Sequence, residues 1–241
     1  MGPLLAVAAI YLALAFILQW RSQPFAERFK RRRLFWLWVI ALGVVLAKIS
    51  EDVLALESGP VDKALLSWIH AVVPPSLNDF FLALTLSASA KVILALTSIT
   101  TVALFVTHRR MEAALFPSTV LAALLLVYVV KTLVERTRPA LWDTRWYWGS
   151  SFPSGHTLTS AAFATAACIA LARRWPRTRW PAFALATTWV VLVASSRLVL
   201  GVHWPTDVLA AACAGVLVAL AMDAAFSALW QAHRAREDRD A

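Results

Sequence analysis

The chain has 241 residues, of which 60% are hydrophobic and only 15% are charged, and its mean hydropathy is +0.67. Soluble domains contain about 45–50% apolar residues, so this composition excludes an ordinary soluble protein and indicates an all-α, polytopic membrane helix bundle. The formal net charge of +9 is compatible with a nucleic-acid partner, but the basic residues gather in short segments between apolar runs. This distribution is typical of membrane loops, and we expect no nucleic-acid partner.

Apolar runs that approach the length of a membrane span recur along the chain. A helix that crosses hydrocarbon needs about 20 apolar residues, within a range of roughly 17–25. The seven candidate spans are residues 4–20, 34–56, 80–106, 112–134, 157–172, 180–199 and 206–230. The first run lacks the basic flank and the small-residue cleavage site of a signal peptide, so we expect it to be a span.

Basic residues follow the first, third, fifth and seventh runs and therefore fall on one side of the membrane. The four basic segments are residues 21–33, 108–110, 173–179 and 233–240, and they hold 15 of the 23 Lys and Arg residues. Cytoplasmic loops carry such an excess of Lys and Arg. We therefore expect these segments and the C-terminus in the cytoplasm and the N-terminus outside.

A short amphipathic helix is predicted between the second and third runs, within residues 59–79. Its apolar face consists of Leu65, Leu66, Trp68, Ile69, Val72 and Val73. Its polar residues are Asp62, Lys63, Ser67 and His70. This pattern is typical of a helix that lies flat on the membrane surface, here on the outer side.

Three polar clusters fall on the same outer side. The first ends the fourth run, where Lys131 and Arg138 stand seven residues apart. Seven residues are nearly two helical turns, so both cations share one helix face, and Pro139 ends the helix. Taken alone, the pair also fits two cations that snorkel to the membrane interface.

The second cluster opens the fifth run with the residues SFPSGHT, 151–157. Ser154 suits the N-cap of a helix, and Gly155 lets a ligand approach the backbone closely. Unpaired N–H groups and the helix dipole attract an anion at this point, where His156 occupies the first turn. An ordinary capped helix start with an interfacial histidine is the alternative.

The third cluster is SRLVLGVHWPTD, residues 196–207, between the last two runs. Arg197 and His203 flank a turn that Gly201 makes possible, and Asp207 stands four residues beyond the histidine. A carboxylate at this spacing can accept one imidazole N–H and leave the other ring nitrogen free as a nucleophile. The alternative is that Asp207 only balances the dipole of the last helix.

Together the clusters predict a phosphate site. Three cations, Lys131, Arg138 and Arg197, surround an anion, and two histidines can divide the roles of nucleophile and acid. No group of Asp, Glu, His or Cys on this side has the spacing of metal ligands, so we expect no metal and no cofactor. The cations take over the charge stabilisation that a metal ion would provide.

The three clusters resemble the three-part signature of the type 2 phosphatidic acid phosphatases, which vanadium haloperoxidases and glucose-6-phosphatases share. The motifs are K-x6-R-P at 131–139, P-S-G-H at 153–156 and S-R-x5-H-x3-D at 196–207. The resemblance implies a six-span phosphatase core over residues 34–230. Residues 1–33 then form an additional N-terminal span with a basic cytoplasmic loop, and residues 231–241 form a charged cytoplasmic tail.

The resemblance also implies a role for each site residue. It implies that His203 is the nucleophile that forms a phosphohistidine, that Asp207 orients it, and that His156 protonates the leaving oxygen. The residues that would hold the phosphate are Lys131, Arg138, Ser154, Gly155 through its amide, and Arg197.

The implied activity is metal-independent hydrolysis of the terminal phosphate of a lipid phosphate or pyrophosphate in the bacterial inner membrane, with the site on the periplasmic or extracellular side. Undecaprenyl pyrophosphate, phosphatidylglycerol phosphate and phosphatidic acid are the expected substrates, and a lipid A phosphatase is the alternative within the family. A non-catalytic lipid transporter on the same fold is an alternative of another class. The expected partners are the bilayer and the lipid phosphate in it, and the sequence leaves the oligomeric state open.

Two features near the predicted site have two interpretations each. Trp142, Trp146, Tyr147 and Trp148 form either an interfacial aromatic belt or a guide for the lipid head group. Lys91 either snorkels outward from the third run or contacts a second phosphate of the substrate.

Overall fold

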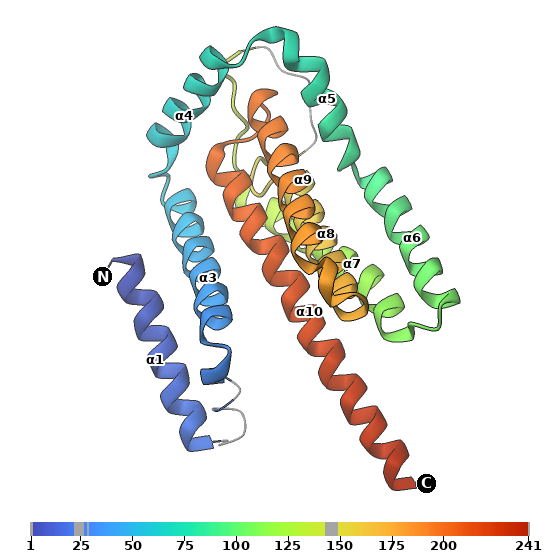
Figure 1. Cartoon of the computed structure of the whole chain (residues 1–241). Helices are drawn as coiled ribbons and strands as arrows, with labels where there is room; N and C mark the ends of the chain where they lie inside the picture. The colour runs from blue at the N-terminus through green and yellow to red at the C-terminus, as the bar shows by residue number, and fades with distance from the viewer. Residues whose placement is uncertain (1, 22–26, 28, 143–148, 241) are drawn as a thin grey trace.

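The structure of the chain is a computed structural model that describes residues 2–21, 27, 29–142 and 149–240. These residues form helices and no strand, which confirms the predicted all-α fold. The helices are α1 (Pro3–Arg21), α3 (Arg33–Leu54), α4 (Gly59–Val72), α5 (Asn78–Ser87), α6 (Ala90–Val106), α7 (Arg110–Val134), α8 (Gly155–Arg174), α9 (Arg179–Val199) and α10 (Pro205–Asp240), with short 3₁₀ helices at Pro75–Leu77 and Pro176–Thr178. Figure 1 shows their arrangement as a bundle of long helices.

Within the described part of the chain, five helices are long and apolar enough to cross a membrane. These helices are α3, α7, α8, α9 and α10, while α1 and α6 are apolar but shorter. The protein is therefore a multi-pass membrane protein, as the composition predicts.

The third predicted span is wrong as a single continuous helix. The run 80–106 is divided at Ala88 and Ser89 into α5 and α6. Ser89 is the N-cap of α6, and its hydroxyl accepts a hydrogen bond from the main-chain N–H of Val92 at 3.4 Å. Serine hydroxyls bond to nearby backbone groups and so favour helix boundaries over helix interiors. As a result, α5 packs against α9 and α6 packs against α7, along one flank of the bundle (Figure 1).

The centre of the bundle is the crossing of α8 and α10, which pack extensively against each other. Their buried core cluster contains mostly small residues: Ala123, Leu158, Ala162, Ala211 and Ala214. Gly215 is required at the crossing, because a Cβ there would lie 2.4 Å from the carbonyl oxygen of Leu158. Helices in lipid associate through close van der Waals packing, which small residues permit.

The first span lies at the outside of the bundle, where α1 packs against α3 (Figure 1). Phe29 joins the two helices, with ring centroids 4.9 Å from Tyr11 and 5.4 Å from Trp36. This peripheral position agrees with a span added outside a phosphatase core, a division of the chain that stays a prediction.

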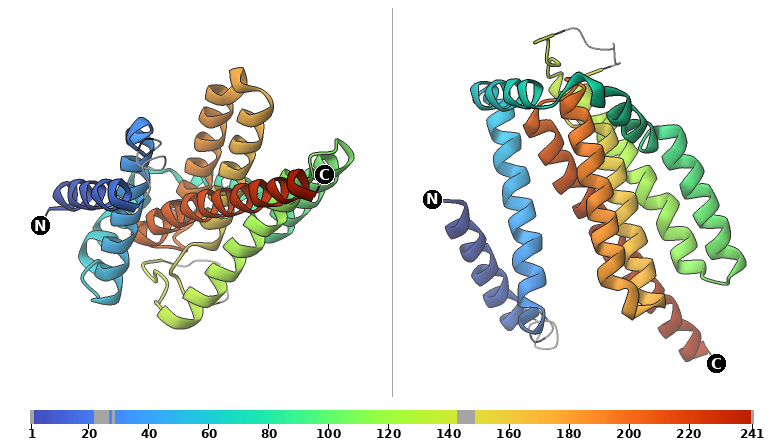
Figure 2. Two further views of the ribbon diagram at one scale, coloured as in Figure 1. Left: turned by 90° about the horizontal axis from the view of Figure 1, so that it is seen from below. Right: turned by 45° about the horizontal axis from the view of Figure 1, so that its top comes forward.

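The predicted surface helix, α4, lies across one end of the bundle and crosswise to α3, as the right-hand view of Figure 2 shows. The chain then bends by 92° between α4 and the segment Pro75–Ser87. Trp68 and Val72 remain 61% and 59% exposed on the protein itself, as expected of side chains that face lipid. The flat position of this helix follows the prediction.

One of the predicted polar residues of α4 turns toward the bundle. Asp62, expected among the surface polar residues, is fully buried together with Leu66. A buried carboxylate is tolerated only when its oxygens are bonded. Arg136 and Thr206 supply those bonds, and both belong to distant parts of the chain.

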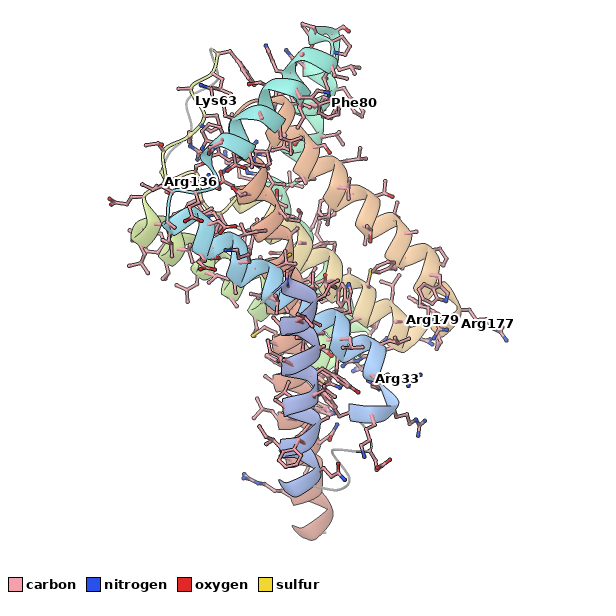
Figure 3. All side chains as sticks on the ribbon, turned by 90° about the vertical axis from the view of Figure 1, so that its left-hand side faces the viewer. Arg33, Lys63, Phe80, Arg136, Arg177 and Arg179 are labelled. Carbon is pink, nitrogen blue, oxygen red and sulfur yellow. The ribbon has the colours of Figure 1, made fainter. Side chains whose placement is uncertain are left out.

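Residues of the predicted basic segments lie toward the end of the bundle opposite α4. Figure 3 shows Arg33, Arg177 and Arg179 toward one end and Lys63 and Arg136 toward the other. The C-terminal part of α10 extends from the same end as the basic loops (Figure 1). The charge asymmetry inferred from the sequence therefore has a counterpart in the fold.

Candidate active site

The three predicted clusters meet at the α4 end of the bundle. Lys131 lies in the last turn of α7, His156 in the first turn of α8, and Arg197 in the last turn of α9. Asp207 lies in the first turn of α10, and His203 stands in the short turn between α9 and α10. Helix ends from four parts of the chain thus bring the polar side chains together where the apolar bundle stops.

His203 and Asp207 form the centre of this arrangement. The imidazole Nδ1 lies 3.4 Å from Oδ2 of Asp207, and both side chains are buried. The other ring nitrogen, Nε2, lies 3.4 Å from Nη1 of Arg138. A guanidinium only donates, so Nε2 is the unprotonated nitrogen and Nδ1 carries the proton toward the carboxylate. The lone pair of Nε2 therefore faces a cation.

Burial lowers the pKa of His203 to about 4, although the hydrogen bond that its imidazole donates to Asp207 acts in the opposite direction. An ordinary histidine has a pKa near 6.5. The imidazole is therefore neutral at physiological pH, which is the protonation state that a nucleophile needs.

The helix face predicted for Lys131 and Arg138 is wrong, because α7 ends at Val134 and Arg138 lies beyond it. Both cations are instead held by main-chain carbonyls of the neighbouring loops. Nη1 of Arg138 donates to the carbonyl of Val202 at 2.8 Å, and its Nε donates to the carbonyl of Gly149 at 3.2 Å. The ammonium of Lys131 donates to the carbonyl of Ser150. A cavity of about 340 Å³ beside them is lined by Lys131, Thr132, Glu135, Arg136, Thr137, Arg138, Gly149 and Ser150. Both cations thus border this cavity, while its lining includes neither histidine nor Arg197.

Arg197 and His156 complete the charged group. Arg197 is 1% exposed, and its Nη1 donates to the hydroxyl of Thr85 on α5. His156 is half-buried and interacts electrostatically with Arg197, His203, Lys131 and Arg138. His156 therefore lies within electrostatic range of all three predicted cations and of the second histidine.

The start of α8 has the predicted position but not the predicted capping bond. Ser154 occupies the N-cap, yet its hydroxyl pairs with the hydroxyl of Thr157 at 3.1 Å instead of capping the helix. Its main-chain N–H donates to the carbonyl of Asp207 at 3.2 Å, which ties α8 to α10. A Cβ on Gly155 would touch Val127 at 3.4 Å, so the glycine also lets α8 approach α7. The first-turn amides of α8 have no acceptor within the helix and can bind an anion.

Several partners of Asp207 were not found by sequence reasoning. Oδ2 accepts hydrogen bonds from the hydroxyl of Ser151 and from the main-chain N–H of Trp204, the latter at 2.9 Å. Oδ1 accepts from Arg136, which also binds Asp62 on α4. Arg136 occupies a variable position inside the K-x6-R-P motif, and the sequence carries no signal that pairs it with Asp62.

An aromatic contact covers the turn that precedes His203. The indole of Trp142 stacks on His70 of α4 with ring centroids 3.9 Å apart. Gly201 has a φ of +65°, and a Cβ there would lie 2.6 Å from Nε1 of Trp142. The predicted aromatic residues Trp146, Tyr147 and Trp148 lie outside the described residues.

The remaining predictions concern Lys91 and metal. Lys91 lies in the first turn of α6, where it is exposed. In the described part of the chain, no group of three or more His, Cys, Asp or Glu residues could hold a metal ion. Contact of Lys91 with substrate and independence of metal both stay predictions.

The sequence can also be compared with known protein families. The sequence matches the PAP2 superfamily over residues 112–231, a segment that contains all eight predicted site residues. The chain belongs to the PAP2 superfamily. This finding confirms the family that the three motifs resemble.

Curated relatives from the PAP2 superfamily match a shorter segment of the chain. Phosphatidylglycerophosphatase B of Escherichia coli and of Shigella flexneri is 43% identical over 74 residues, which are 30% of this chain and 28% of the relative. The matched segment thus spans little more than a quarter of the curated relatives' length.

Two solved structures share the fold. The transmembrane PAP2-type phosphatidylglycerolphosphate phosphatase of Bacillus subtilis superposes with a TM-score of 0.72 and 24% identity, covering 77% of this chain and 94% of that one. LpxE of Aquifex aeolicus superposes with a TM-score of 0.55 and 23% identity, covering 66% of this chain and 92% of that one. The helix bundle described above is therefore the membrane PAP2 fold.

Proposed function

We propose that this PAP2 protein is an integral membrane phosphatase that removes the terminal phosphate of a lipid phosphate or pyrophosphate through a phosphohistidine intermediate. The observation that carries the proposal is the position of a neutral, buried imidazole between Asp207 and Arg138 at the end of an apolar bundle. This site carries the functional assignment, because one fold can host several activities.

In the first chemical step, Nε2 of His203 attacks the phosphorus atom. A bond forms between nitrogen and phosphorus, and the bond from phosphorus to the lipid oxygen breaks. Asp207 accepts the Nδ1 proton as a hydrogen bond and stabilises the positive charge that develops on the ring. The charge on the phosphoryl oxygens is stabilised by Lys131, Arg138, Arg197 and the first-turn amides of α8.

His156 is proposed as the general acid and base. It gives a proton to the leaving lipid oxygen and then takes one from the water that cleaves the phosphorus–nitrogen bond. Its place in the first turn of α8, next to the amides proposed to hold the phosphate, supports this role. The products are the dephosphorylated lipid and inorganic phosphate.

The substrate is proposed to be a lipid because the site opens at the end of membrane-crossing helices. The similarity to phosphatidylglycerophosphatase B favours phosphatidylglycerol phosphate, with phosphatidic acid and undecaprenyl pyrophosphate as the other substrates to compare. All three present a terminal phosphate to the same group of cations.

We also propose that the site faces the periplasmic or extracellular side of a bacterial inner membrane. The basic segments at the other end of the bundle support this orientation. Ala140 and Arg177 are exposed at opposite ends and suit cysteine labelling in a background without Cys168 and Cys213. An impermeant thiol reagent applied to intact cells should label Ala140→Cys and spare Arg177→Cys, and the reverse pattern would place the site in the cytoplasm.

The function itself is tested by phosphate release from the purified protein in detergent micelles. Phosphatidylglycerol phosphate, phosphatidic acid and undecaprenyl pyrophosphate are compared by kcat/KM, with His203→Ala as the matched inactive control. We expect release from at least one lipid and none from the control. Binding or movement of these lipids without phosphate release would favour a non-catalytic transporter on the same fold.

A further inference from the structure

We infer that Asp62 and Arg136 are positioning residues for the catalytic carboxylate, so that the surface helix α4 sets the orientation of Asp207 and through it of His203. This inference rests on the proposed phosphatase function, since it concerns the same site. It assigns a role in the reaction to a helix that carries none of the three motifs.

A single guanidinium joins the two carboxylates. Nη1 of Arg136 donates to Oδ1 of Asp207, and Nη2 donates to Oδ2 of Asp62 at 2.6 Å. The side chain of Arg136 is 12% exposed, and both carboxylates are buried. An arginine fixes such a geometry better than a lysine, because its planar fork presents separate N–H groups to each partner.

The contact leaves each oxygen of Asp207 with a separate task. Oδ1 faces Arg136, while Oδ2 faces Nδ1 of His203 and the hydroxyl of Ser151. Rotation of the carboxylate would break both sets of bonds together. Arg136 therefore fixes the plane of the group that orients the nucleophile.

Asp62 has a second contact with the same element. Its Oδ1 accepts the main-chain N–H of Thr206 at 3.0 Å, and its Oδ2 accepts the hydroxyl of Thr206 at 2.7 Å. Thr206 immediately precedes Asp207 in the first turn of α10. A carboxylate at a helix N-terminus is stabilised by the helix dipole, so Asp62 holds both the start of α10 and the arginine that orients its first acidic residue.

The positive charge of Arg136 explains why Asp207 needs the second carboxylate, Asp62, beside it. Without Asp62, the whole positive charge of Arg136 would act on Asp207 and weaken its attraction for the imidazolium that forms during the reaction. With Asp62 in place, the guanidinium is shared, and Asp207 keeps more of its negative charge for His203. The pair thus combines an orienting role with an electrostatic one.

The test is a double-mutant cycle on the purified full-length chain. Asp62→Asn should lower kcat by roughly ten- to a hundredfold, because small misplacements of reacting groups have effects of that size. KM should stay within about twofold, because the residues proposed to hold the phosphate are untouched. Asp79→Asn is the matched control, since Asp79 is exposed at the start of α5 on the same end of the bundle.

The decisive readout is the effect of Asp62→Asn in an Asp207→Asn background. If Asp62 acts through Asp207, the second substitution should change kcat by less than about twofold there. A residue that only caps α10 would cause the same fold-loss in both backgrounds, and that result would overturn the inference, as would an unchanged kcat in the single variant. If Asp62→Asn does not fold, Arg136→Lys replaces it in the cycle, because an ammonium keeps the charge but cannot bridge both carboxylates. A wild-type protein that releases no phosphate from any lipid would overturn the proposed function and this inference with it.

Discussion

Gly201→Ala tests whether Trp142 packs on the turn that carries His203. Gly201 has a φ of +65°, and an L-residue in this region costs about 1–2 kcal/mol. The new Cβ would also overlap the indole, 2.6 Å from Nε1, and overpacking of this kind typically costs about 1–3 kcal/mol. The indole cannot move away freely, because it stacks on His70.

The two costs together lower the stability by about 3 kcal/mol, which corresponds to a fall in Tm of roughly 6–12 °C for a protein of this size. The assay is thermal unfolding in detergent, with kcat measured in parallel because Val202 and His203 follow the altered residue. Gly149→Ala is the matched control. It has a φ of +75° and open space around its Cβ position, so only the backbone cost of about 1–2 kcal/mol applies.

A second comparison isolates the indole. In a Trp142→Ala background the overlap is gone, so Gly201→Ala should lower Tm by only roughly 3–6 °C, as in the control. Equal losses from Gly201→Ala with and without Trp142, or a loss no greater than that of Gly149→Ala, would refute the packing of Trp142 on this turn.

Three further predictions concern the general acid, metal and pH. His156→Ala should slow the first step with phosphatidic acid far more than with a nitrophenyl ester, because an alkoxide needs a proton to leave and a nitrophenolate does not; equal slowing would contradict the role of His156. Activity should persist in excess EDTA and be inhibited by vanadate, since cations and amides stabilise the phosphate; loss on chelation with recovery in magnesium would contradict this. Burial lowers the pKa of His203 in the folded protein to about 4, whereas in the unfolded chain this histidine has a pKa near 6.5. Between these two values the unfolded chain binds more protons, so the stability of the fold decreases as the pH falls from about 6.5 to about 4. From about pH 8 to about pH 5 the wild type should lose about 2 kcal/mol more stability than His203→Ala, and equal losses in thermal unfolding would contradict the shift.

The sequence predicted the meeting of the three clusters because each stands at the end of an apolar run. Lys131, His156 and Asp207 are fixed by helix boundaries, and alternate runs end on the same side of a membrane. These helix boundaries depend on local rules that act over a few residues. The expected helix face shared by Lys131 and Arg138 did not form, because α7 ends at Val134.

The sequence did not predict the contacts of Asp62 with Arg136 and Thr206, which lie 74 and 144 residues away in the chain. The pattern of α4 placed Asp62 among surface polar residues, and only tertiary packing buried this one side chain. No rule of periodicity anticipates such a pair, because either residue alone also fits a solvated surface.

The division of the third span had a signal that hydrophobicity concealed. Ser87 and Ser89 stand close together in an otherwise apolar run. The hydroxyl of Ser87 donates to the carbonyl of Leu84 at 2.6 Å and accepts from the indole of Trp189 at 3.0 Å, while Ser89 caps α6. Serines that bond to the backbone favour helix ends, which a count of apolar residues does not detect.

The central claim, that His203 is the nucleophile, is tested most directly by trapping the phosphoenzyme. Purified protein is mixed with a labelled lipid phosphate, quenched, and the acid-labile label is mapped to a residue. We expect the label on His203 and none in His203→Ala. With a labelled nitrophenyl phosphate, whose leaving group needs no proton, more label should accumulate in His156→Ala because water has lost its base. A label that forms normally in His203→Ala, or that maps to His156, would contradict the account.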